Sequence, residues 1–195
     1  MHQTTTPDGP SALILVRHGA TRPNLAGLRC GGDLDAALTD LGRRQAMRAA
    51  LRLQALEVPV GVIVTSNLQR TRESAEIIQR VLGRIEIVIE PAFAERRLGS
   101  WNLRPAAETE RALLARETPP GGEADADFVE RIARATHAHL VPRLGQRPLL
   151  VGSKGVARAL GERLGLPGLP PLANGEWHRF ELAEFARLNI HACHA

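Results

Sequence analysis

Short apolar runs rich in Val, Ile and Leu alternate with longer amphipathic stretches along most of this chain. The apolar runs predict strands at residues 12–16, 60–65, 85–89, 148–151 and 177–182. Apolar residues at helical spacing predict helices at residues 39–56, 68–82, 106–116, 124–144 and 155–164. Thr39 is the expected N-cap of the first of these helices. Because strands that alternate with helices favour a mostly parallel sheet covered by helices, we expect an α/β fold.

Length and composition favour one domain. The chain has 195 residues, of which 44% are hydrophobic, and is therefore long enough to bury one core. Two Pro/Gly clusters, at residues 119–122 and 166–171, interrupt the expected helices but are too short to separate two domains. We expect a single domain over residues 1–195, with residues 1–10 as a flexible tail.

The charge and cysteine content narrow the class of partner. The net charge is +4 and the pI about 10.3, but the arginines are interleaved with carboxylates and aromatic residues make up only 3% of the chain. This pattern argues against nucleic acid as a partner. Cys30 and Cys193 lie far apart and show neither disulfide nor metal-site spacing. The sequence has no secretion signal and no membrane span, so we expect a cytoplasmic protein.

The most informative motif is the apolar run 13–16, which ends on Arg17-His18-Gly19. In an open α/β sheet the ligand crevice lies beyond the carboxyl ends of the strands, so Arg17 and His18 are expected to face a ligand there. Gly19 permits a sharp turn of the backbone. The alternative is that His18 is a structural histidine, hydrogen-bonded at a strand end.

Several motifs in sequence order resemble those of the histidine phosphatase superfamily, the phosphoglycerate mutase-like group. They cover nearly the whole chain and comprise the segments 17–21 with Asn24, 38–46, 65–71, 93–101 and 120–123, the last followed by Phe128 and Arg131. The resemblance implies a three-layer α/β/α sandwich with a mostly parallel sheet. It also implies a phosphatase that needs no cofactor and no metal ion.

The resemblance assigns a chemical role to four residues. Arg17 and Arg70 would neutralise the phosphate oxygens, because a planar guanidinium can bind two oxygens at once. His18 would accept the phosphoryl group on an imidazole nitrogen and pass it to water. Glu95 would protonate the departing alkoxide and then deprotonate the attacking water. The structural alternatives are a solvated Arg70 at a helix start and a Glu95 that is solvated or paired with its arginine neighbours.

Asn24 is a further candidate for phosphate binding, because its amide hydrogens can be donated to a phosphate oxygen. The alternative is a local role in a turn. The chain departs from the family pattern after the strand expected at residues 148–151. There the family carries a second histidine, and Ser153 occupies the corresponding position.

Two neighbouring residues are candidates to replace this histidine in phosphate binding. Lys154 is the only lysine of the chain and has a mobile ammonium group, while Ser153 has a neutral hydroxyl. His178, at the start of the last expected strand, is a third candidate to stand in for the missing imidazole.

We predict a phosphatase that hydrolyses a small phosphorylated metabolite through a phosphohistidine on His18, at a site altered by Ser153 and Lys154. The alternative is a catalytically impaired relative that uses Arg17 and Arg70 to bind an anionic ligand or partner. The sequence predicts no metal site, no nucleic acid and no membrane as a partner, and leaves the oligomeric state open.

Overall fold

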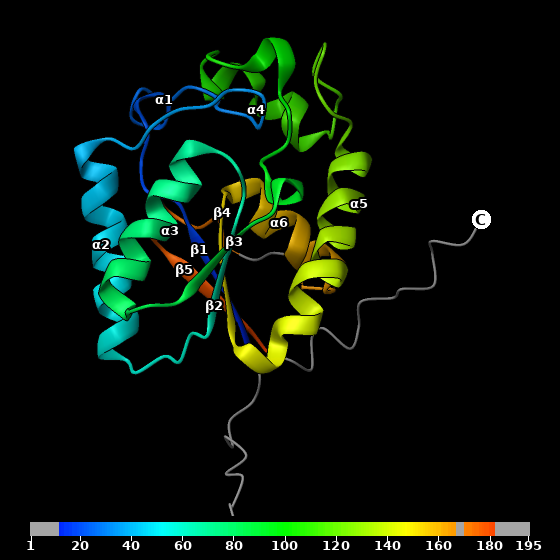
Figure 1. Ribbon diagram of the computed structural model, residues 1–195. Helices are drawn as coiled ribbons and strands as arrows, with labels where there is room; N and C mark the ends of the chain where they lie inside the picture. The colour runs from blue at the N-terminus through cyan, green and yellow to red at the C-terminus, as the bar shows by residue number, and fades with distance from the viewer. Residues whose placement is uncertain (1–11, 167–169, 182–195) are drawn as a thin grey trace, which may run out of the picture.

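The computed structural model describes residues 12–166 and 170–181, and a five-stranded sheet forms its centre (Figure 1). The strands are β1 (Ala12–Arg17), β2 (Val62–Thr65), β3 (Glu86–Ile89), β4 (Pro148–Gly152) and β5 (Trp177–Glu181). Their order across the sheet is β3-β2-β4-β1-β5. The first four are parallel to one another, and β5 is antiparallel to β1. The predicted mostly parallel sheet is confirmed.

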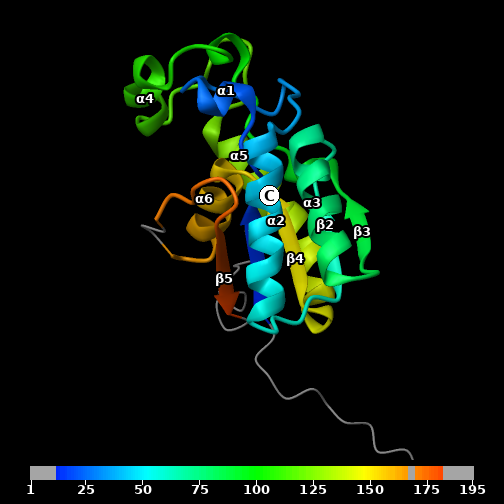
Figure 2. The same cartoon turned by 90° about the vertical axis from the view of Figure 1, so that its left-hand side faces the viewer.

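Helices cover both faces of this sheet (Figures 1 and 2). One face packs against α2 (Asp40–Ala55) and α3 (Gln69–Leu82), and the other against α5 (Asp125–Ala135) and α6 (Lys154–Arg163). The short helices α1 (Arg22–Leu25) and α4 (Ala106–Leu114) lie beyond the end to which the parallel strands point. This arrangement is the predicted three-layer α/β/α sandwich.

The strand β1 shows how the sequence builds two cores. Leu13 and Leu15 belong to the cluster under α5 and α6, whereas Ile14 and Val16 belong to the cluster under α2 and α3. All four side chains are at most 4% exposed, because successive residues of a strand point to opposite faces and both faces are covered. Burying one such side chain contributes about 1.5–3 kcal/mol. These two cores hold the end of β1 in a fixed place.

The helix α2 begins at the N-cap residue that the sequence predicts. The Thr39 hydroxyl accepts a hydrogen bond from the Gly42 N–H (3.1 Å), which confirms Thr39 as the N-cap of α2.

The predicted helix 124–144 is wrong in its second half: α5 ends at Ala135 and is followed by a π-helical turn (Thr136–Leu140) and a 3₁₀ segment (Val141–Gln146). Pro142 explains the change, because proline has no N–H for a regular helical bond.

The remaining short elements were not predicted from the sequence: α1 and two 3₁₀ turns, Pro91–Phe93 and Gly99–Trp101. Some parts of the sequence predictions lie outside the described residues. They are the predicted tail 1–10, residues 167–169, the last residue of the predicted strand 177–182, and Cys193. The single domain over the full length stays a prediction.

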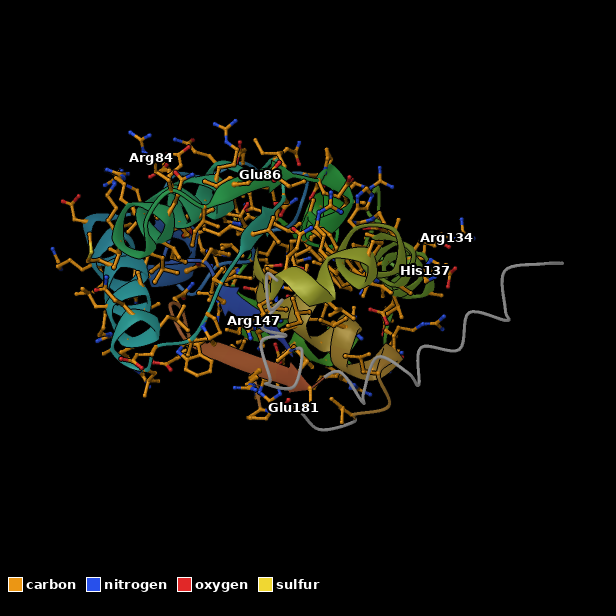
Figure 3. The ribbon with its side chains drawn as sticks, turned by 60° about the horizontal axis from the view of Figure 1, so that its bottom comes forward. Arg84, Glu86, Arg134, His137, Arg147 and Glu181 are labelled. Carbon is orange, nitrogen blue, oxygen red and sulfur yellow. The ribbon has the colours of Figure 1, made fainter. Side chains whose placement is uncertain are left out.

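Charged residues of both signs mix at the amino-terminal end of the parallel strands. Arg84 and Arg147 share this end of the molecule with Glu86 and Glu181 (Figure 3). Among the described helices, none is long and apolar enough to cross a membrane. Within the same residues, no group of three His, Cys, Asp or Glu side chains is arranged to hold a metal ion.

Candidate active site

The carboxyl ends of three neighbouring strands bring the predicted site residues together. Arg17 is the last residue of β1 and lies opposite Gly152, the last residue of β4. His18 follows directly, and its backbone N–H donates to the Gly152 carbonyl (2.9 Å). On the other side of β4, β2 ends at Thr65 and leads into α3, whose second residue is Arg70. Parallel strands end at the same edge of a sheet, so these residues surround one point.

His18 is buried, at 4% exposure, in a defined tautomer. Its Nδ1 lies 2.7 Å from the Gly19 carbonyl oxygen. Because a carbonyl only accepts hydrogen bonds, Nδ1 carries the proton and Nε2 keeps its lone pair. Burial, then the charge of Arg70 and also that of Arg17, lower the pKa of His18 to about 3, although the bond to Gly19 acts in the opposite direction. The imidazole is therefore neutral at physiological pH.

Arg70 is buried, at 1% exposure, and backbone carbonyls hold its guanidinium. Its two terminal nitrogens donate to the carbonyls of Leu34 (2.9 Å) and Gly31 (3.0 Å). Arg17 is held similarly, by the carbonyl of Leu172 (2.6 Å). Burial lowers the pKa of Arg17 and the charge of Glu95 opposes this shift, which shows that the two charges lie close enough to interact.

Three donor groups of this site have no hydrogen-bond partner among the residues that the structure describes. Within the described residues, five buried side-chain nitrogen or oxygen atoms make no hydrogen bond: Arg17 Nε, Arg70 Nε, Ser153 Oγ, Glu73 Oε1 and Trp177 Nε1. An unpartnered buried polar atom costs about 1–3 kcal/mol, so such groups require an explanation. Three of the five belong to residues predicted to bind phosphate. A bound anion would provide the acceptor that Arg17, Arg70 and Ser153 lack.

Glu95 reaches the same region from a loop. Its Oε1 accepts the Arg96 N–H (2.7 Å), and its Oε2 accepts the Gly155 N–H in the first turn of α6 (2.9 Å). A Cβ atom on Gly155 would lie 2.1 Å from Oε1, so only glycine leaves room for the carboxylate. Ser153, the N-cap of α6, lies two residues before Gly155. The structure therefore brings Glu95, Ser153 and Arg17 together.

The three residues predicted as candidates to replace the second family histidine occupy different places. Ser153 is 3% exposed and follows Gly152, the residue that is hydrogen-bonded to His18. Lys154 is the exposed first residue of α6 and makes no hydrogen bond or ion pair with the described part of the chain. His178 lies on β5 opposite Leu15, with its ring edge against Phe180 (4.7 Å between ring centres). Ser153 is the candidate nearest to His18 along the hydrogen-bonded backbone.

Asn24 has a structural role in this arrangement. Its side-chain oxygen accepts the Thr21 N–H (3.2 Å), while the Thr21 hydroxyl accepts the Asn24 N–H, forming a capping box at α1. The same oxygen accepts a hydrogen bond from Asn174 (3.4 Å), whose amide also donates to the His18 carbonyl (2.9 Å). Sequence reasoning missed Asn174 because the residue lies in a loop before β5 with no motif around it.

Known proteins resemble this chain in sequence and in fold. A family model described as histidine phosphatase superfamily (branch 1) matches residues 13–194. The chain belongs to the histidine phosphatase superfamily. The resemblance inferred from the motifs is thereby confirmed.

Relatives within the superfamily carry different names. The chain is 39% identical over 167 residues to a probable phosphoglycerate mutase GpmB of Cronobacter sakazakii, covering 80% of this chain and 75% of the relative. It is 32% identical over 165 residues to a metal-independent phosphoserine phosphatase of Arabidopsis thaliana, covering 78% and 68%. A mycobacterial glucosyl-3-phosphoglycerate phosphatase solved with VO3 superposes with a TM-score of 0.73 at 30% identity, covering 86% of this chain and 91% of that one. These matches confirm the fold.

Proposed function

We propose that this protein is a phosphatase that hydrolyses a small phosphomonoester through a phosphohistidine intermediate on His18. The observation that carries the proposal is the set of three unpartnered donors, on Arg17, Arg70 and Ser153, around a neutral imidazole. A phosphate monoester is a dianion at neutral pH, so it matches a site with two guanidinium groups and a hydroxyl. The superfamily membership and the phosphatases among the relatives support the same reaction.

In the first step, the lone pair of His18 Nε2 attacks phosphorus as the bond to the ester oxygen breaks. The departing alkoxide takes a proton from the Glu95 carboxyl, so the alcohol leaves neutral. The imidazole ring becomes positively charged, and its Nδ1–H keeps its proton and donates a hydrogen bond to the Gly19 carbonyl, which stabilises that charge. Arg17 and Arg70 stabilise the negative charge on the oxygens of the transferred group.

In the second step, water attacks the phosphohistidine. The Glu95 carboxylate accepts a proton from this water while the bond between phosphorus and Nε2 breaks. Inorganic phosphate leaves, and His18 returns to its neutral form. One carboxyl group serves both half-reactions, and each step conserves protons.

In this mechanism Ser153 supplies the hydrogen bond that the second family histidine donates elsewhere. A hydroxyl donates without charge, so the site carries less positive charge than that of a typical member when that histidine is protonated. Lys154 restores a cation nearby. The Glu95 carboxylate, which accepts the Gly155 N–H, is an anion close to this helix N-terminus and favours a cation there.

The absence of the second histidine is also the observation that favours the other candidate function. A protein that kept both guanidinium groups but lost efficient catalysis would bind a phosphorylated ligand without hydrolysing it. Both functions require the same anion site, so binding alone does not separate them. Turnover separates them.

The test uses 4-nitrophenyl phosphate as a generic substrate, with the native protein and His18→Ala. We expect release of nitrophenol from the native protein and an acid-labile phosphoryl label, both lost in His18→Ala. His137→Ala is the matched control, because His137 is exposed on the turn after α5, and it should retain full activity. No turnover and no label, together with a melting temperature that vanadate raises, would establish the binding protein instead.

Three further variants examine the altered part of the site. Ser153→Ala and Lys154→Ala each remove one proposed donor, and the larger loss of kcat/KM identifies the residue that replaces the missing histidine. Ser153→His restores the family residue and should raise activity if Arg17, His18 and Glu95 are otherwise in place. No gain would mean that the site has been remodelled beyond this one position.

A further inference from the structure

The segment that carries Glu95 has no regular secondary structure of its own. Ala94–Leu98 runs between the 3₁₀ turns Pro91–Phe93 and Gly99–Trp101, so no strand ladder and no α-helix holds it. The position of the Glu95 carboxylate therefore depends on contacts made by the neighbouring backbone. A general acid misplaced by 1 Å can lose about 100-fold in rate, so these contacts matter for catalysis.

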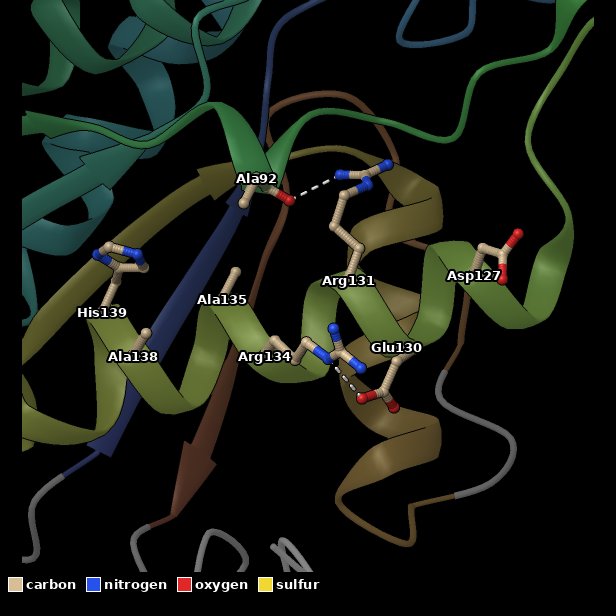
Figure 4. A pocket seen from close by; sticks show the side chains of 8 residues that line it. All are labelled: Ala92, Asp127, Glu130, Arg131, Arg134, Ala135, Ala138 and His139. Carbon is tan, nitrogen blue, oxygen red and sulfur yellow. Dashed lines mark hydrogen bonds and ion pairs between the residues drawn. The ribbon is translucent and has the colours of Figure 1, made fainter. Parts of the chain in front are cut away.

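Arg131 makes the side-chain contacts to the backbone at and just before Glu95. From α5 it reaches across to the segment, where one terminal nitrogen donates to the carbonyls of Ala92 (2.6 Å) and Ala94 (3.0 Å). Figure 4 shows the side chain of Arg131 directed toward Ala92. The other terminal nitrogen donates to the carbonyl of Glu95 itself (3.5 Å). The guanidinium thus binds the backbone before Glu95 and at Glu95.

Glu123 binds Arg131 and also the backbone of Arg97, which follows Glu95 in the segment. Its carboxylate accepts two bonds from Arg131 (2.9 and 2.8 Å) and one from the N–H of Arg97 (3.2 Å). Its own N–H donates to the carbonyl of Arg97 (2.9 Å). Burial acts to raise the pKa of Glu123, but the hydrogen bond and charge of Arg131 lower it overall, so the carboxylate is ionised at neutral pH. Arg131 and Glu123 together fix the backbone on both sides of Glu95.

We propose that Arg131 is a positioning residue, which holds the Glu95 carboxylate against the N–H of Gly155 and so controls proton transfer to the leaving group. This inference rests on the phosphatase reaction proposed above. Arg131 does not touch the reacting atoms. It acts through the backbone carbonyls of the segment that carries the acid.

The chemistry of the contacts requires arginine. Arg131 uses all three of its nitrogens, two for the carboxylate of Glu123 and the terminal pair for the carbonyls. A lysine has one nitrogen, which cannot reach the carboxylate and the carbonyls at the same time. Arg131→Lys therefore keeps the charge but releases the segment around Glu95.

The same helix offers a matched control. A hollow of about 460 Å³ on the outer side of α5 is lined by Arg131 and Arg134, together with Ala92, Asp127, Glu130, Ala135, Ala138 and His139. Arg134 binds Glu130 on its own helix (Figure 4), at 2.9 Å. The side chain of Arg134 is 71% exposed. Arg134→Lys makes the same chemical change, one turn away, without releasing the segment around Glu95.

The kinetic test compares two substrates that depend differently on a general acid. Nitrophenolate leaves readily without a proton, whereas the alkoxide of a primary alkyl phosphate requires one. We expect Arg131→Lys to lower kcat/KM for the alkyl phosphate at least tenfold more than for 4-nitrophenyl phosphate. Arg134→Lys should lower neither. An equal fall for both substrates in Arg131→Lys, or the same result in Arg134→Lys, would overturn the inference.

A second measurement does not require turnover. The amide proton of Gly155 reports the bond to Glu95 directly, so its NMR shift in Glu95→Gln should differ from that in the native protein. In Arg131→Lys we expect this resonance to move away from its native position, while Arg134→Lys matches the native protein. An unchanged Gly155 resonance in Arg131→Lys would refute the positioning role. If the native protein hydrolyses neither ester, the proposed function fails and the control of proton transfer fails with it, whereas this measurement still decides whether Arg131 positions the Glu95 carboxylate.

Discussion

Replacing His18 by Asn should change how the stability of this protein depends on pH. Burial and the two neighbouring guanidinium groups lower the pKa of His18 from 6.5 to about 3 in the folded protein. In the unfolded chain the His18 imidazole takes up a proton at a higher pH than it does in the folded chain. The stability that comes from keeping His18 neutral is therefore complete above pH 6.5 and is lost as the pH falls toward 3.

The size of the effect follows from the pKa shift. Each pH unit below 6.5 removes about 1.36 kcal/mol of unfolding free energy from the native protein relative to His18→Asn. The difference between the two proteins should change by about 2 kcal/mol between pH 7.5 and pH 5. Below the folded pKa the change levels off at about 5 kcal/mol. Acidic residues titrate in both proteins and cancel in the comparison.

Urea unfolding at several pH values between 7.5 and 4 measures this difference. The buffers must contain no phosphate, because an anion bound beside His18 would favour its protonated form. His137→Asn is the control, since His137 is exposed and its replacement should leave the pH dependence unchanged. Parallel stability curves for the native protein and His18→Asn would show that His18 titrates normally, and the reasoning about a neutral nucleophile would be wrong.

Three other substitutions have defined outcomes. Gly155→Ala places a Cβ 2.1 Å from Glu95 Oε1 and should lower kcat for an alkyl phosphate at least tenfold in steady-state assays. Gly145→Ala is the control and should leave kcat unchanged, because a Cβ at Gly145 meets nothing within 4 Å. Thr39→Ala removes the cap of α2 and should cost about 1 kcal/mol in urea unfolding, and a loss below 0.3 kcal/mol would contradict the capping role. Ile132→Ala, at a fully buried position of α5, should cost about 2–5 kcal/mol in the same assay, and a loss under 1 kcal/mol would mean that the core collapses around the vacated volume.

The buried strands show why the fold was predictable. The run 13–16 is apolar at every position, and both faces of β1 are covered in the structure. Such a pattern is local, so the apolar run suffices to locate the strand. The helix predicted at 124–144 failed in its second half for a reason that the sequence does contain, since Pro142 lies within it.

The candidate site was predictable in its residue types and not in its geometry. Arg17, His18 and Arg70 lie at the ends of predicted strands or just beyond them, where an α/β sheet collects its ligands. The place of Glu95 depends on contacts with Arg131 and Gly155, far away in the chain. No local pattern predicts such contacts, and they appear only after the segments have packed.

Local sequence patterns were sufficient to establish the α/β order of elements, the family resemblance and the residues that reach the edge of the sheet, because side-chain periodicity and turn chemistry act over a few residues. The tertiary structure alone decided the neutral tautomer of His18, the unpartnered donor on Ser153 and the support of Glu95 by Arg131. Burial and electrostatic fields depend on atoms brought together from distant parts of the chain, and a pKa or a missing hydrogen-bond partner exists only once those atoms are in place.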